Sequence, residues 1–158
     1  MKRLIKGLSE YVILFLVYAA IYFMIETVWK GQPADYRMFI LGGVLGVLIG
    51  LLNNIFTYDT DLLLQGYAGM ITVCLAEAVF GYQWNVLQGL GIWDYTELPF
   101  SAVAGQVNLF FAAAWFFLSV ICIFLDDFIW YKLFGHERPY YRILGKRFEL
   151  YGRRRRKK

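Results

Sequence analysis

Long apolar runs separated by short polar segments dominate the pattern along the chain. A helix rises about 1.5 Å per residue, so roughly 20 apolar residues cross the hydrocarbon core of a bilayer. Three runs have this length, and a fourth is apolar apart from Gln65, Thr72 and Glu77. The pattern therefore predicts an all-α integral membrane protein, a bundle of about four transmembrane helices over residues 11–29, 38–56, 62–82 and 107–125.

An aromatic segment separates the third and fourth predicted helices. It contains Trp84, Trp93, Tyr95 and Phe100, and such rings favour the interface between membrane and water. Pro99, with glycines around it, argues against one continuous helix here. We expect a cap or a re-entrant segment on the outer side of the membrane.

The basic residues indicate the orientation. No Lys or Arg lies between Arg37 and Lys132, while the chain from Lys132 onward holds 11 of the 16 basic residues. Basic residues near helix ends stay on the cytoplasmic side, so both termini are predicted to be cytoplasmic, although Lys30 and Arg37 oppose this weakly. Residues 1–131 form the expected transmembrane domain, and 132–158 a basic cytoplasmic tail.

Glycines recur every fourth residue in the second predicted helix. Gly42, Gly46 and Gly50 therefore share one face, where small residues allow two helix backbones to approach closely. We expect this face to pack within the bundle or between protomers. A substrate path along it is the alternative.

Two carboxylates are expected at similar depth on the outer side, because Glu26 and Glu77 lie near the ends of the first and third helices. Asp94 and Glu97 of the aromatic segment belong to the same side. With no basic partner in the neighbouring segments, such a group takes up a proton or binds a cation. The alternative is that these acids are partly hydrated or accept hydrogen bonds from tyrosine and tryptophan.

Motifs for autonomous chemistry are absent from the sequence. Cys74 and Cys122 have no metal-ligand neighbour at the usual spacing and are expected to be buried. There is no phosphate-binding loop, no His-Glu-x-x-His and no Gly-x-Ser-x-Gly. We therefore predict no catalytic residue, no metal and no cofactor, and we expect no nucleic-acid partner.

Several motifs resemble the small polytopic proteins of a bacterial family designated ABC-transporter permease, CmpB-like. They are AEAVFGYQWN at 76–85, IWDYTELPF at 92–100, Gly105-Gln106, Trp115 and LDD at 125–127. The resemblance spans most of the chain and implies the bacterial cytoplasmic membrane. Where many members have Asn-Glu after the glycines, this chain has Asn53-Asn54. The positions that it implies as functional are Glu26, Glu77, Asn85, Trp93, Asp94, Tyr95, Gln106 and Trp115.

The leading hypothesis is a membrane-embedded subunit for small-molecule transport or binding that has no ATPase of its own. Glu26, Glu77 and Asp94 would form its outer-side site under Trp93 and Tyr95. We expect a homo-oligomer or a separate membrane or ATPase subunit as partner. The alternatives are an intramembrane enzyme and a scaffold that assembles through the glycine face, with anionic lipid held by Arg153–Lys158.

Overall fold

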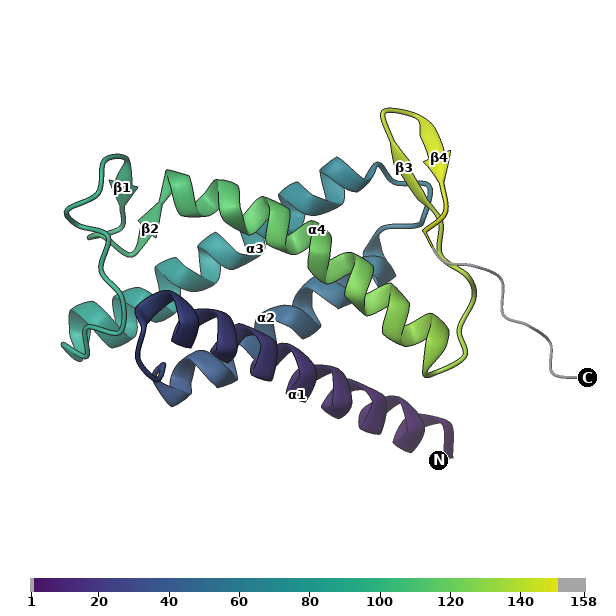
Figure 1. The fold of residues 1–158 in the computed structure, drawn as a ribbon, viewed down its shortest axis with the longest axis horizontal. Coiled ribbons are helices and arrows are strands. Elements are labelled where there is room, and N and C mark those ends of the chain that lie inside the picture. Colours follow the sequence, from purple (N-terminus) through teal and green to yellow (C-terminus); the bar gives the residue numbers. More distant parts are fainter. Residues whose placement is uncertain (1, 151–158) are drawn as a thin grey trace, which may run out of the picture.

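Four α-helices form the body of the computed structural model, which describes residues 2–150. They run alternately between the two ends of an elongated bundle (Figure 1). A π-helical segment, η1 (Tyr82–Leu87), extends the third helix. The four predicted helices are thus confirmed, with the bounds α1 Lys2–Lys30, α2 Tyr36–Ile55, α3 Leu62–Gly81 and α4 Leu109–Lys132.

Three stretches are long and apolar enough to cross a membrane: Gly7–Lys30, Leu62–Leu87 and Leu109–Lys132. The fourth helix, α2, has 20 residues, Tyr36–Ile55, and contains the apolar stretch Tyr36–Leu52. At 1.5 Å per residue the whole helix extends about 30 Å, close to the thickness of a hydrocarbon core.

Large apolar side chains are exposed along the outside of the bundle. Ile71 is 54% exposed, Leu75 62% and Phe117 65%. A soluble monomer rarely exposes contiguous apolar surface on this scale. The surface is therefore suited to lipid rather than to water.

The helices associate as two hairpins, α1 with α2 and α3 with α4. Gly42 and Gly46 face the rings of Tyr22 and Tyr18 of α1, and a Cβ at either position would overlap the tyrosine. A Cβ at Gly50 would lie 2.5 Å from a carboxylate oxygen of Asp126 of α4. The face of α2 that carries Gly42, Gly46 and Gly50, hereafter the glycine face, thus packs within the chain. Packing within the bundle was expected of it, with packing between protomers as the other possibility.

Polar side chains cap the first turns of three helices. Asp35 accepts a hydrogen bond from the backbone of Arg37 at 2.8 Å, and Asp61 accepts one from Leu63 at 2.9 Å. Asn108 does the same for Phe110 at 2.9 Å. Each cap satisfies a backbone N–H that has no partner within its helix, so these residues fix where α2, α3 and α4 begin.

Residues 82–108, hereafter the cap segment, cover the end of the bundle where α1 ends and α4 begins (Figure 1). Two short strands, β1 (Ser101–Ala102) and β2 (Val107–Asn108), pair antiparallel within it. The expectation that no single continuous helix runs through this segment is confirmed, although it begins with the π-helical η1. We call this end of the bundle the cap end.

A second β-hairpin covers the opposite end of the bundle. It is formed by β3 (Tyr141–Ile143) and β4 (Lys146–Phe148). Arg142 makes an ion pair with Asp59 of the α2–α3 loop at 2.9 Å, and the backbone of Leu144 donates to Asp61 at 2.6 Å. The segment expected to be a basic tail therefore includes a folded part. The run Arg153–Lys158, expected to hold anionic lipid, lies outside the described residues.

Candidate functional site

The cap end gathers acidic and aromatic side chains from α1, α3, α4 and the cap segment. The Tyr22 hydroxyl donates to Oε1 of Glu26 over 3.5 Å, and the Tyr95 hydroxyl donates to Oε1 of Glu77 over 3.4 Å. Ordinary O–H···O hydrogen bonds are 2.5–3.0 Å long. Both carboxylates are therefore weakly held by these tyrosines.

Glu77 is the more deeply placed of the two acids, with 4% of its surface exposed. Neither its Oε2 atom nor Nε1 of Trp115 has a close hydrogen-bond partner, but the indole N–H lies beside the carboxyl group and interacts with it as a donor. Glu77 is therefore paired loosely with Trp115 as well as with Tyr95.

Glu26 has a basic partner, which the sequence analysis did not expect. Nζ of Lys30 lies 3.1 Å from Oε2 of Glu26, and it also donates to the carbonyl of Ile92 at 2.9 Å. The ion pair joins residues one helical turn apart, and the second bond ties the end of α1 to the cap segment. The expectation of a carboxylate with no basic neighbour is therefore wrong for Glu26.

A cleft of about 420 Å³ opens between the end of α1, the cap segment and the start of α4. Glu26 and Lys30 contribute its charged groups. The ring of Tyr95 stacks on that of Phe111, with centroids 4.5 Å apart, and so forms part of the wall. The remaining aromatic rings in the lining are those of Tyr22, Trp29, Trp93, Phe110 and Trp115.

Asn85 and Gln106 hold the cap segment in place rather than line this cleft. The Asn85 amide donates to Oε1 of Gln106 at 2.7 Å and accepts from the backbone of Ile92 at 2.7 Å. The Trp93 indole donates to the carbonyl of Gln106 at 3.1 Å. A Cβ at Gly81 would lie 2.7 Å from Gln106, so the small residue allows the cap segment to seat on α3.

Asp94 lies apart from the other predicted acids. Its side chain is exposed and accepts hydrogen bonds from the Thr96 hydroxyl and, at 2.8 Å, from the Thr96 backbone. These bonds from Thr96 stabilise the carboxylate and lower the pKa of Asp94. The structure therefore brings Glu26, Glu77, Trp93, Tyr95 and Trp115 together but leaves Asp94 in a turn on the surface.

A smaller cavity of about 130 Å³ lies in the middle of the bundle, between α1, α2 and α4. It is lined almost entirely by apolar side chains and by Gly42 and Gly46. Ser119 is its main polar exception: its side chain is 1% exposed, and its Oγ atom has no hydrogen-bond partner. The sequence places Ser119 on α4 but gives no signal for a cavity beside it.

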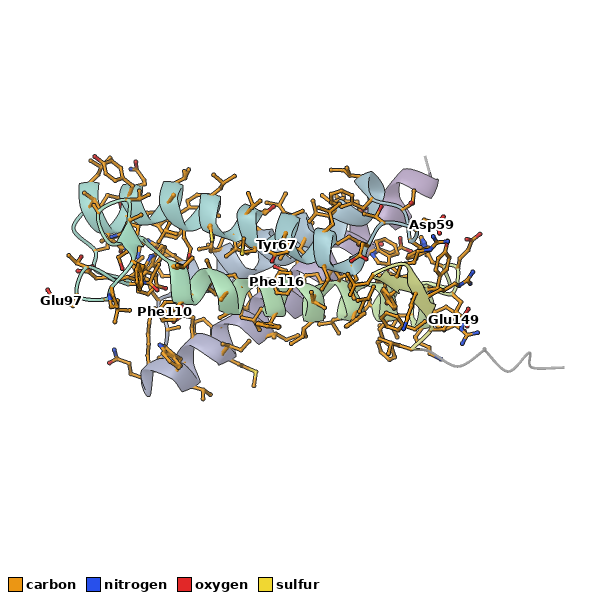
Figure 2. The ribbon with its side chains drawn as sticks, turned by 90° about the horizontal axis from the view of Figure 1, so that it is seen from above. Asp59, Tyr67, Glu97, Phe110, Phe116 and Glu149 are labelled. Carbon is orange, nitrogen blue, oxygen red and sulfur yellow. The ribbon has the colours of Figure 1, made fainter. Side chains whose placement is uncertain are left out.

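A third cavity, of about 380 Å³, lies at the end opposite the cap and has two carboxyl groups among the aromatic rings of its lining. Asp126 and Asp127 are 1% and 3% exposed and line it together with Tyr58 and His136. The Tyr18 hydroxyl donates to Asp126 at 2.7 Å. Figure 2 shows the two ends of the bundle, marked by Glu97 at the cap segment and Asp59 beside the second hairpin.

No protein-family model, no curated protein and no solved structure matches this chain. Within residues 2–150, no group of three or more His, Cys, Asp or Glu side chains could hold a metal ion. The chemistry of the site must therefore be argued from its geometry. A buried acid, an ion pair in the lining and a wall of aromatic rings suit the binding of a cation or amine.

Proposed function

We propose that this chain is a multi-pass protein of the bacterial cytoplasmic membrane that binds a small amine or cation in the cleft at its cap end. The basic residues that follow α4 favour placing both termini in the cytoplasm and the cap segment outside. The motif resemblance described above favours a subunit associated with transport, whose energy source is a separate ATPase.

One observation carries the proposal: Glu26 lines a cleft whose wall is made of aromatic rings. Glu77 itself does not line the cleft, whereas the rings of Tyr95 and Trp115 in front of it do. The faces of such rings attract a cation. Glu26, in the lining, supplies the direct acceptor for an ammonium N–H.

The glycine face favours this function over assembly of a scaffold. Gly42 and Gly46 are covered by α1 of the same chain. A second copy would have to displace Tyr18 and Tyr22 to reach them. The cleft, in contrast, is open to a ligand without any rearrangement of the bundle.

The test is isothermal titration calorimetry, which measures the affinity of the protein in dodecyl maltoside for butylamine. Wild type is compared with Glu26→Gln. A hydrogen bond to a charged group contributes about 1.5–3 kcal/mol, so we expect Glu26→Gln to weaken binding about 10- to 100-fold. Glu77→Gln should weaken binding less, because Glu77 contacts the rings of Tyr95 and Trp115 and not the ligand itself. Glu97→Gln, in the cap segment but exposed, is the matched control and should bind as wild type does.

Equal affinity of wild type and Glu26→Gln for butylamine would refute the proposal. So would the absence of any binding heat for wild type together with an unchanged melting temperature in butylamine. A loss in Glu97→Gln as large as that in Glu26→Gln would show that general surface charge, and not this cleft, attracts the amine.

A further inference from the structure

The cleft at the cap end adjoins the cavity in the middle of the bundle. Four residues line both spaces: Tyr22 and Ile25 of α1, and Trp115 and Leu118 of α4. The rings of Tyr22 and Trp115 meet at this junction, with centroids 5.9 Å apart. We call the two adjoining spaces, polar at the cap end and apolar below it, the α1/α4 groove.

Contacts between α1 and α4 close the groove at its far end. There, the Tyr18 hydroxyl donates to Asp126, and the rings of Tyr11 and Trp130 meet edge to face with centroids 5.6 Å apart. Along α4 the apolar part runs from Leu118 to Leu125, which is about 10 Å at 1.5 Å per residue. Residues 118–125 lie at the middle of α4 (Leu109–Lys132), so the apolar section lies near the centre of the bilayer.

The groove opens sideways toward the surface that would face lipid. Ile21 is 40% exposed, Ile25 43% and Ile121 59%, and all three line it. A hydrocarbon chain can therefore enter from the bilayer without crossing the packed core. A free polar solute gains nothing from this apolar section, so the section argues for an amphiphile.

The polar end offers groups of both signs to a head group. Glu26 is an acceptor for an ammonium group, and Lys30 beside it is a donor. The indole N–H of Trp115, which lines both sections, is held only loosely by the Glu77 carboxyl group beside it. An ion pair of this kind complements a zwitterion: the acid attracts the amine, and the N–H donors attract a phosphate or an ester oxygen.

We propose that the α1/α4 groove binds one membrane phospholipid with a primary-amine head group. The amine lies against Glu26 and the aromatic wall, the phosphate toward Lys30 and Trp115, and one acyl chain along the apolar section. This inference rests on the proposed function, because the head group occupies the same cleft. It identifies the ligand as a membrane lipid.

The experiment is photo-crosslinking in phosphatidylcholine vesicles that contain the full chain and a trace of phosphatidylethanolamine with a diazirine in one acyl chain. Peptides covering 118–125 should be labelled about tenfold more than the lipid-facing surface of α3 near Leu75 and Val79, as one charge-assisted bond allows. A phosphatidylglycerol probe with the same chains should label both surfaces alike.

Two variants separate the chain from the head group. Ile21→Trp places a larger ring in the apolar section, outside the lining of the cleft, and should abolish labelling of 118–125, while butylamine binding persists. Met24→Trp is its matched control, since Met24 is 65% exposed and lines none of the described cavities, and it should be labelled as wild type is. Glu26→Gln should remove the preference for the amine head group.

Equal labelling of 118–125 by both probes would overturn the head-group assignment, and labelling no stronger there than near Leu75 would overturn the acyl-chain site. If butylamine binding depends on Glu26 in those cases, the proposed function survives and this inference alone fails. If butylamine binding is also absent, both fail.

Discussion

Replacing Gly46 by alanine tests whether the glycine face holds α1 against α2. The added Cβ would overlap Cβ and Cγ of Tyr18, atoms close to the backbone that no rotamer change moves far. Only a shift of α1 relieves the overlap. Overpacking costs about 1–3 kcal/mol, and replacing glycine in a helix recovers up to about 1 kcal/mol. We therefore expect a net loss of about 1–2 kcal/mol in the free energy of unfolding.

The assay is unfolding of the protein from dodecyl maltoside by increasing mole fractions of sodium dodecyl sulfate, followed by tryptophan fluorescence. Gly7→Ala is the matched control, because Gly7 also lies in a helix but a Cβ there meets no atom within 4 Å. It should leave stability unchanged or raise it by up to about 1 kcal/mol. The two variants share the gain in helix propensity and differ only in the overlap.

The oligomer mass, measured on the same samples by light scattering, supplies the refutation. Wild-type stability in Gly46→Ala combined with a smaller oligomer would show that the glycine face packs between protomers. The intramolecular contact with Tyr18 would then not be the one that the alanine disturbs. A loss of stability at unchanged oligomer mass is the expected result.

Three further predictions follow from single contacts. Tyr18→Phe removes the 2.7 Å bond to buried Asp126 and should lower the free energy of unfolding by about 1–2 kcal/mol in the same assay. Burial, and then the charge of Asp127, raise the pKa of Tyr58 from 10.0 to about 12. The neutral tyrosine therefore contributes stability that is full below pH 10 and is lost toward pH 12, which thermal melts over this range should show. In Tyr58→Phe that part of the fall should be missing. Gly105 has a φ of 77°, and a Cβ there would lie 2.7 Å from Asp94. Gly105→Ala should therefore speed hydrogen exchange in the cap segment and leave that of α2 unchanged.

The helices were predictable because lipid imposes a simple requirement. A spanning helix needs a long apolar run, and its length is fixed by the bilayer rather than by tertiary contacts. The strands were not predictable in this way. Tyr141 of β3 is 2% exposed because it packs on Phe124, with ring centroids 4.7 Å apart, and a hydropathy pattern cannot reveal that contact.

The candidate site was predictable in part. Glu26 and Glu77 do converge, since helices that run in the same direction bring their corresponding ends to one depth. The partner of Glu26 could have been found, because Lys30 follows it at the four-residue spacing that joins ion pairs on a helix. The orientation of Asp94 could not, since it depends on a turn closed by Thr96 within an irregular segment.

The arrangement of the acids also bears on the choice between binding and catalysis. A general base must reach the proton that it removes, within hydrogen-bond distance or through one water. Glu77 lies behind Tyr95 and Trp115 and does not line the cleft, while Glu26 is held by Lys30. Glu77 is therefore not presented to a substrate as a base, and Glu26 reaches the cleft only as one member of an ion pair. This arrangement favours our proposal that the site binds a charged group, and that the groove below it accommodates a hydrocarbon chain, over catalysis.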